Sequence, residues 1–274
     1  MKYVDTIGQI LVDFVSRSDV PRHEPSGRGV KLAAIIYYDK YLDGEEVVVL
    51  PTVADDAREI QELLEEKFKY QLLSEDPNPN VLQSCQEKQL QNERNLVKTF
   101  ELRLKKWKNG VDIGTIVDTF LIYYHGHGTE VLKNPCLLTR KWTAIPVDEL
   151  VNLVTEVINP IHYCLVLDCC SNYKADTKAI KRLEEAIKTR AKDFGDRLIT
   201  VSAAPSGHTA MALKGKTLTA ALVVVLKESL DQGIRRIPLQ GLEWRLRQEQ
   251  EKAGSSNLPT VLLPSKLSGK VFPL

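Results

Sequence analysis

The sequence predicts an α/β fold in which a mainly parallel sheet is covered by helices on both faces. Two segments, Phe120–Tyr124 and Tyr163–Leu167, are short continuous apolar runs rich in β-branched and aromatic residues. Such runs are typical of parallel strands that are buried on both sides. They alternate with stretches in which apolar residues recur at helical spacing, and this alternation indicates a parallel sheet with helical crossovers. The 274 residues suffice for one large domain with a sizeable core.

The N-terminal part contains the first elements of this pattern. Residues 1–29 are expected to form an extension that packs on the core, with a helix over Val4–Val15, and residues 30–274 are expected to form the main domain. Lys31–Tyr38 is predicted to be the first buried strand. Asp56–Tyr70 has apolar residues at helical spacing and an acidic start, which favours the N-terminal end of a helix dipole.

The remaining elements continue the alternation to the C-terminus. Strands are expected at short apolar runs and helices at longer amphipathic stretches, with segments rich in Pro, Gly, Asn and Ser between them. In chain order, we expect a strand at Gln71–Leu73, a loop at Ser74–Asn80, a helix over Gln86–Lys108, the strand Phe120–Tyr124, a short strand at Cys136–Thr139, a helix over Val147–Val157, the strand Tyr163–Leu167, an amphipathic basic segment over Ala175–Lys192, a strand at Arg197–Ala204, and helices over Thr217–Leu230 and Pro238–Glu251.

Composition and charge exclude several classes of partner. The chain has 37 basic and 36 acidic side chains, a net charge of +1, so neither nucleic acid nor a membrane surface is an expected partner. Its N-terminus lacks the apolar core of a signal peptide, and no apolar segment approaches the ~20 residues that span a bilayer. The 5 cysteines are odd in number and irregularly spaced, which indicates reduced thiols. The sequence therefore predicts a cytoplasmic protein.

Reactive side chains follow two apolar strands at the point where each strand ends. Tyr124-His125-Gly126-His127-Gly128 closes the first, and Asp168-Cys169-Cys170 closes the second, with Cys170 43 positions after His127. The carboxyl ends of parallel strands form the crevice where ligands bind, so an imidazole and a thiol are expected in one cleft. A neighbouring imidazole can take the thiol proton and generate a thiolate nucleophile. The spacing therefore predicts nucleophilic cysteine chemistry.

Other interpretations of these residues stay open on the sequence alone. Cys169 and Cys170 are also compatible with packing at a strand end, because reduced cysteine is often buried. Cys169 is less suited to attack, since neighbouring strand side chains point to opposite faces. A zinc site formed by His125, His127 and the cysteines is disfavoured because no Cys-x-x-Cys pair accompanies them. Neither a metal nor another cofactor is expected.

At the histidine and cysteine motifs together, the sequence resembles the caspase-like cysteine peptidases, particularly metacaspases and paracaspases. Those families place Tyr-x-Gly-His-Gly at one strand end and Asp-x-Cys at the next, which match Tyr124–Gly128 and Asp168–Cys170. Leu50–Ala57 resembles the segment that opens their first helix, and Val201–Pro205 resembles a wall of their substrate groove. The resemblance covers about residues 30 to 272. It implies a caspase-like three-layer sandwich and a peptidase domain over residues 30–274.

The sequence also departs from these families. Asp168 and Cys169 stand where the Gln-Ala-Cys-x-Gly signature of caspases has Gln and Ala, so cleavage after aspartate is not expected. Ser171-Asn172-Tyr173 replaces the His-Ser-Gly that usually follows the cysteine of metacaspases. His125 replaces their small residue before the Gly-His pair. The subfamily therefore stays open.

The resemblance implies a role for each site residue. His127 and Cys170 would be the catalytic dyad, and the backbone N–H groups of Gly128 and Cys170 would stabilise the oxyanion. The residues expected to contact substrate are Asp168, Asp56, His125, Ser202 and Ala203. Two carboxylates attract a basic side chain, and arginine can form two hydrogen bonds with one carboxylate. The resemblance thus implies an endopeptidase that acts on proteins or peptides and cuts after Arg or Lys.

Alternatives remain for single residues and for the whole domain. Asp56 is also suited to stabilise a helix N-terminus, Asp168 to accept a strand-end hydrogen bond, and His125 to support a groove residue from behind. A catalytically silent caspase-like scaffold, or a dimerisation domain that regulates a larger assembly, would fit the same pattern. The resemblance suggests a homodimer formed near Thr260–Leu263, because an exposed strand edge can pair with a second chain.

Overall fold

The computed structural model describes most of the predicted main domain. It covers residues 29–43, 45–73, 93–131, 134–170, 197–204, 210, 213–234, 237–257, 259–262 and 271–272. Residues 1–28 of the expected extension, the expected loop at Ser74–Asn80 and the basic segment Ala175–Lys192 lie outside the described residues.

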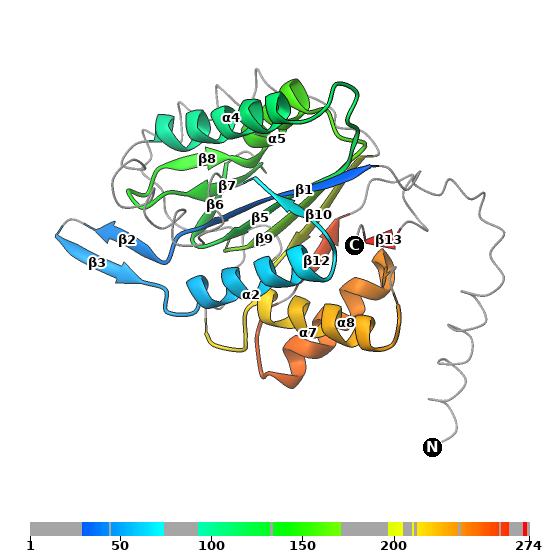
Figure 1. The fold of residues 1–274 in the computed structure, drawn as a ribbon. Coiled ribbons are helices and arrows are strands. Elements are labelled where there is room, and N and C mark those ends of the chain that lie inside the picture. Colours follow the sequence, from blue (N-terminus) through cyan, green and yellow to red (C-terminus); the bar gives the residue numbers. More distant parts are fainter. Residues whose placement is uncertain are drawn as a thin grey trace.

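A six-stranded sheet forms the centre of the molecule (Figure 1). In spatial order it consists of β12 (Thr260–Leu262), β10 (Leu198–Ser202), β9 (His162–Asp168), β5 (Val117–His125), β1 (Val30–Tyr37) and β4 (Gln71–Leu72). Neighbouring strands are parallel except for the antiparallel pair of β12 and β10. The prediction of a mainly parallel sheet is confirmed, and the two strands with reactive ends are direct neighbours.

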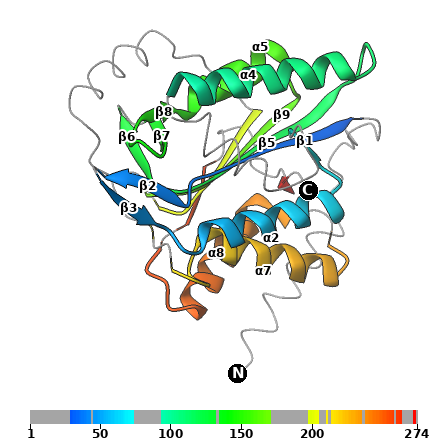
Figure 2. The same ribbon diagram turned by 60° about the vertical axis from the view of Figure 1, so that its left-hand side comes forward.

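Helices cover both faces of the sheet and complete three layers, as Figures 1 and 2 show from two directions. One face carries α4 (Glu93–Gly110) and α5 (Val147–Val157), and the other carries α2 (Val53–Glu66), α7 (Leu218–Asp231) and α8 (Leu239–Lys252). The predicted layers are therefore confirmed. Within the described residues, none of the helices has the length and apolar character needed to cross a membrane.

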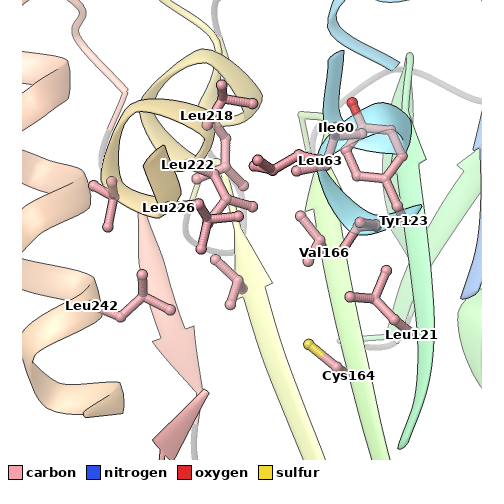
Figure 3. Packing of buried hydrophobic residues seen from close by; sticks show 14 of the residues in the cluster. Ile60, Leu63, Leu121, Tyr123, Cys164, Val166, Leu218, Leu222, Leu226 and Leu242 are labelled. Atoms are coloured by element: carbon pink, nitrogen blue, oxygen red, sulfur yellow. The ribbon is translucent and has the colours of Figure 1, made fainter. Parts of the chain in front are cut away.

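Alternate side chains of the central strands enter two separate hydrophobic cores. On β5, Leu121 and Tyr123 belong to the core beneath α2 and α7, whereas Ile122 and Tyr124 belong to the core beneath α4 and α5. Figure 3 shows the first core, where side chains of β5 and β9 face those of α2 and α7. Successive strand side chains point to opposite faces, so a strand buried on both faces needs apolar residues at almost every position. This requirement explains the continuous apolar runs in the sequence.

The ends of the first long helix differ from their predicted positions. α2 begins at Val53, three residues before the expected start at Asp56, and ends at Glu66 instead of Tyr70. Lys69 has a φ of +60°, in the left-handed region, which stops the helical backbone there. Apolar spacing continues past this point in the sequence, but the backbone turns toward β4.

Three small antiparallel sheets surround the central one and were largely unpredicted. They consist of β2 (Lys40–Asp43) with β3 (Glu46–Val49), of β6 (Gly128–Val131), β7 (Asn134–Leu138) and β8 (Ala144–Pro146), and of β11 (Ile237–Pro238) with β13 (Val271–Phe272). Their strands have between two and five residues, which is too short for a distinct apolar pattern. Only β7 corresponds to a predicted strand, the one expected at Cys136–Thr139.

Candidate active site

The two reactive strand ends lie side by side. β5 and β9 are neighbouring parallel strands whose register pairs His125 with Asp168. The N–H of Gly126 donates to the carbonyl oxygen of Asp168 at 3.3 Å. Just beyond, Sγ of Cys170 lies 3.5 Å from the carbonyl oxygen of Gly128. The fold therefore brings the histidine motif and the cysteine motif together at one edge of the sheet.

Gly128 is a point of close approach between the two strand ends. A Cβ at this position would lie 2.5 Å from the carbonyl oxygen of Cys170 and 2.6 Å from Sγ of Cys169. Both distances are far below van der Waals contact. The oxygen belongs to the backbone and the sulfur to a short side chain, so neither atom can move aside easily. Only glycine fits without moving the cysteines.

We expect Gly128→Ala to lower the free energy of unfolding by about 1–3 kcal/mol, the usual cost of forcing a methyl group into a packed site. Urea unfolding of the two proteins measures the change. Gly241→Ala in α8 is the matched control, because a Cβ there would project into open space. That control is expected to gain about 0.5–1 kcal/mol, since alanine favours a helix over glycine. Equal stability of Gly128→Ala and the wild type would contradict the close approach.

The backbone of Gly128 also presents a hydrogen-bond donor toward the cysteine. The N–H of Leu138 donates to the carbonyl oxygen of His127, which makes Gly128 and Leu137 a non-hydrogen-bonded pair of the β6–β7 ladder. The N–H and C=O groups of Gly128 therefore both point away from β7. Because this C=O faces Cys170, the N–H of Gly128 points to the same side of the strand.

His127 packs beside two aromatic rings whose centroids lie 4.8 Å from each other. Its ring centroid lies 4.6 Å from that of Tyr41 and 5.2 Å from that of Trp142. Its backbone N–H donates to Oη of Tyr41 at 2.6 Å. Burial lowers the pKa of His127 below its ordinary value of 6.5, because a low-dielectric environment disfavours the charged imidazolium. A neutral imidazole of this kind can accept a proton from a thiol.

The two histidines of the motif point to opposite faces of the sheet because the chain turns at Gly126 between them. Strict alternation would place His127 on the same face as His125. Instead, its ring contacts Tyr41 and Trp142, which belong to the core beneath α4 and α5. Gly126 has a φ of +157°, which residues with a side chain rarely adopt, and the chain can turn there for this reason.

The other histidine, His125, lies beside both carboxylates that were expected to line a substrate pocket. Its Nδ1 is 3.7 Å from Oδ2 of Asp56, and its Nε2 is 3.7 Å from Oδ2 of Asp168. The side chains of His125 and Asp168 are 2% exposed and that of Asp56 is 13% exposed. Burial raises the pKa of Asp56, although a hydrogen bond from Thr217 and the proximity of His125 oppose this shift. We refer to the side chains of Asp56, His125 and Asp168 together as the buried acidic cluster.

The N-terminus of α7 anchors both carboxylates of the buried acidic cluster. The backbone N–H and the hydroxyl of Thr219 each donate to Oδ2 of Asp168 at 2.7 Å. The hydroxyl of Thr217 donates to Oδ2 of Asp56 at 2.8 Å. Negative charge is stabilised at a helix N-terminus, where N–H groups are unpaired and the dipole is positive. Asp168 thus accepts the strand-end hydrogen bonds that were one of its expected roles.

The buried acidic cluster is also the only one, within the part of the chain that the structure describes, whose potential metal-ligand atoms converge. One such atom from each of Asp56, His125 and Asp168 lies within 4.8 Å of the others. Oδ2 of Asp168, however, already accepts two hydrogen bonds from Thr219, which use its lone pairs. The side chains therefore fit a hydrogen-bonded network better than a metal centre. His127 and the adjacent cysteines form no such group within that part of the chain.

The other predicted site residues take different places. Ser202 lies on β10, where its hydroxyl is 2.7 Å from that of Thr260. Ala203 is fully buried, and its N–H donates to the carbonyl oxygen of Leu167 at 3.0 Å. Cys169 packs against the core beneath α4 and α5, and burial raises the pKa of its thiol. Its placement agrees with a packing role.

Four residues of the site were not predicted to belong to it. Tyr41 lies in a hairpin, and Trp142 lies in a turn with a left-handed φ of +61°, so only the tertiary fold brings them to His127. Thr217 follows from a weaker signal, since a threonine before an apolar helical run is a common N-cap, whereas Thr219 lies inside the first turn of α7 and has no such signal. The Thr217 hydroxyl does accept the backbone N–H three residues later, at 3.1 Å.

Comparisons with known proteins agree with this architecture. No curated protein matches the chain. Caspase-1 of Spodoptera frugiperda has a TM-score of 0.57 at 12% identity, with 93% of this chain and 95% of that chain covered. A protein of Geobacter sulfurreducens has a TM-score of 0.54 at 14% identity, with 86% of this chain and 93% of that chain covered. Identities this low show a shared fold alone.

The family assignment comes from the sequence itself. A family model described as a caspase domain matches residues 30–260, which is most of the chain. The resemblance to the caspase-like peptidases as a whole is thereby confirmed. With the caspase-like three-layer sandwich in place around those motifs, the chain belongs to the caspase-domain family of cysteine peptidases.

Proposed function

We propose that the protein is a cysteine endopeptidase in which Cys170 is the nucleophile and His127 is the general base. The observation that carries this proposal is the contact of 3.5 Å between Sγ of Cys170 and the carbonyl oxygen of Gly128. Because Gly128 directly follows His127, this contact supports a shared site for the thiol and the imidazole. Membership in the caspase-domain family supports the same roles.

The proposed reaction has an acylation and a hydrolysis step. His127 takes the proton of the Cys170 thiol, and the sulfur attacks the carbonyl carbon of the peptide bond to form a C–S bond. The carbonyl electrons move to the oxygen, which accepts hydrogen bonds from the N–H groups of Gly128 and Cys170. When the C–N bond breaks, the imidazolium gives its proton to the leaving amine. Water then attacks the thioester, with His127 again as the base, and releases the acid and the thiol.

The proposed substrates carry Arg or Lys immediately before the cut. Asp56 and Asp168 supply buried carboxylates from α2 and β9, and such a pair favours a cationic side chain and repels acidic ones. Arginine is expected to be preferred, because its planar guanidinium can form two hydrogen bonds with a carboxylate. Ser202 and Ala203 are proposed to line the adjoining wall of the groove. The Tyr-x-Gly-His-Gly and Asp-x-Cys motifs favour a metacaspase-like or paracaspase-like branch.

The activity should persist below pH 6.5. Only the neutral imidazole can act as the base, so kcat/KM falls as pH drops through the pKa of His127. Burial lowers this pKa from 6.5, and the acid limb of the pH profile should therefore lie below that value. Initial rates on an arginine peptide, measured from about pH 5 to pH 8, locate the limb. An acid limb above 6.5 would contradict the proposed state of His127.

Two further parts of the proposal concern the compartment and the assembly. No disulfide joins the cysteines that the structure describes, at positions 136, 164, 169 and 170, which supports a reducing compartment such as the cytoplasm. A homodimer is proposed through β12, which is the outermost strand at its side of the described sheet. The outer edge of such a strand offers backbone groups for antiparallel pairing with a second copy.

A positional-scanning library of fluorogenic peptides tests activity and specificity together. Each peptide varies the residue before the cut, and cleavage is expected to be fastest for arginine and next for lysine. His127→Ala serves as the control, since cleavage that it retains comes from a contaminating peptidase. A folded protein that cleaves none of the peptides would refute the endopeptidase and favour the silent scaffold. Preference for another residue would refute only the proposed specificity.

A further inference from the structure

His125 lies directly beside both carboxylates to which a basic side chain of the substrate is proposed to bind. The same oxygen of each carboxylate, Oδ2 of Asp56 and Oδ2 of Asp168, faces one nitrogen of its ring at 3.7 Å. The imidazole is 2% exposed. A guanidinium that approaches the two carboxylates from the side of His125 therefore meets the imidazole within 3.7 Å of each oxygen.

The hydrogen bonds around His125 determine which way its protons point. The Asp168 carboxylate only accepts, so the hydroxyl proton of Thr219 is directed to it. Oη of Tyr123 lies 2.8 Å from Oγ1 of Thr219 and must therefore donate its own proton to that atom. Tyr123 is then an acceptor for Nδ1 of His125, at 3.3 Å. A proton on Nδ1 consequently points toward Tyr123 and Asp56.

His125 thus serves as an internal partner for the two carboxylates. It comes from β5, beside Asp56 on α2 and Asp168 on β9, and the hydroxyls of Tyr123 and Thr219 complete its surroundings. Two buried carboxylates without a donor or cation beside them would repel each other, even with the hydrogen bonds from Thr217 and Thr219 in place. The imidazole, which belongs to the same chain, supplies a donor beside the two carboxylates. A substrate must supply an equivalent group before it can replace the ring.

We propose that His125 is a specificity-determining residue that competes with the basic side chain of the substrate for Asp56 and Asp168. This inference rests on the proposed function of the site. Arginine binding requires the ring to turn away, and the free energy of that displacement reduces the apparent affinity for the substrate. Wild-type protein should therefore have a higher KM for arginine peptides than a variant with a small residue at this position.

His125→Ser tests the competition through kinetics. We expect kcat/KM for an arginine peptide to rise about tenfold to a hundredfold, mainly through KM, which is the range of one charge-assisted hydrogen bond. For a peptide with alanine before the cut, kcat/KM should rise by a clearly smaller factor than for the arginine peptide, because alanine does not reach the carboxylates. His125→Asn, which keeps a donor for one carboxylate, is the second variant should the serine variant not fold. His162→Ser, at the opposite end of β9, is the matched control.

Binding of agmatine, a small guanidinium compound, tests the pocket without catalysis. In a Cys170→Ala background, agmatine should raise the melting temperature of the His125→Ser and His125→Asn proteins at concentrations about tenfold lower than for the protein that keeps His125. Equal effects on all three proteins, with unchanged kcat/KM for arginine peptides, would overturn the inference and leave the peptidase proposal intact. Tighter agmatine binding by the variants without any peptide cleavage would support the occupied pocket and refute the peptidase.

Discussion

Cys170→Ala is expected to abolish peptide cleavage, lowering kcat by at least about a thousandfold, as removal of a catalytic nucleophile usually does. The sulfur of Cys170 lies against Gly128 at the strand end after His127, and no hydroxyl or thiol replaces it in the variant. Cleavage of an arginine-terminated fluorogenic peptide measures the loss. The folded state of the variant is checked by its melting temperature.

The chain offers an adjacent thiol as a matched control. Cys169→Ala should keep most of the activity, because Cys169 packs against the core beneath α4 and α5. Burial also raises the pKa of the Cys169 thiol, so little of the reactive thiolate forms there at neutral pH. Alkylation by iodoacetamide followed by mass spectrometry should accordingly label Cys170 faster. Loss of activity in Cys169→Ala with full activity in Cys170→Ala would reverse the assignment of the nucleophile.

Asp168→Ala is expected to remove the preference for basic residues and to destabilise the fold. The carboxylate is one of the two that are proposed to bind arginine, and kcat/KM for an arginine peptide should fall about a hundredfold, the range of a bidentate charged hydrogen bond. The N–H and hydroxyl of Thr219 would also lose their acceptor in a site where Asp168 is 2% exposed. A buried donor left unpaired costs about 1–3 kcal/mol of stability.

Asp168→Asn separates these two effects. The amide oxygen can still accept the hydrogen bonds of Thr219, so the stability should stay within about 1 kcal/mol of the wild type, whereas the lost charge should remove the arginine preference as strongly as alanine does. Asp118→Ala, at the other end of β5, is the control carboxylate. Cys170 should still react with a small alkylating agent in both Asp168 variants. Unchanged cleavage after arginine would refute the pocket assignment.

Much of the scaffold could be predicted because the buried faces of strands and helices require apolar residues at regular positions in the sequence. β5 and β9 are apolar at nearly every position since both faces are covered, and α2 and α5 show the spacing of a helix that packs on one side. The small sheets could not be predicted in this way. Their strands have at most five residues, and their order depends on pairing with distant segments.

The candidate site was predictable where it depends on strand ends. Parallel strands end at the same edge of a sheet, so the positions of His127 and Cys170 after two apolar runs indicated one cleft. The environment of His127 was not predictable. Tyr41 and Trp142 reach its ring from a hairpin and a turn that have no periodic pattern.

The sequence by itself determined the α/β class, the two strand-end motifs and the family they resemble, because these depend on local periodicity and on the identity of a few residues. Only the tertiary structure decided which groups those motifs face. The turn at Gly126 directs His127 toward aromatic rings and leaves His125 on the opposite face, beside Asp56 and Asp168. Side-chain direction at a strand end depends on one backbone angle and on packing from distant elements, and neither is encoded in residue spacing.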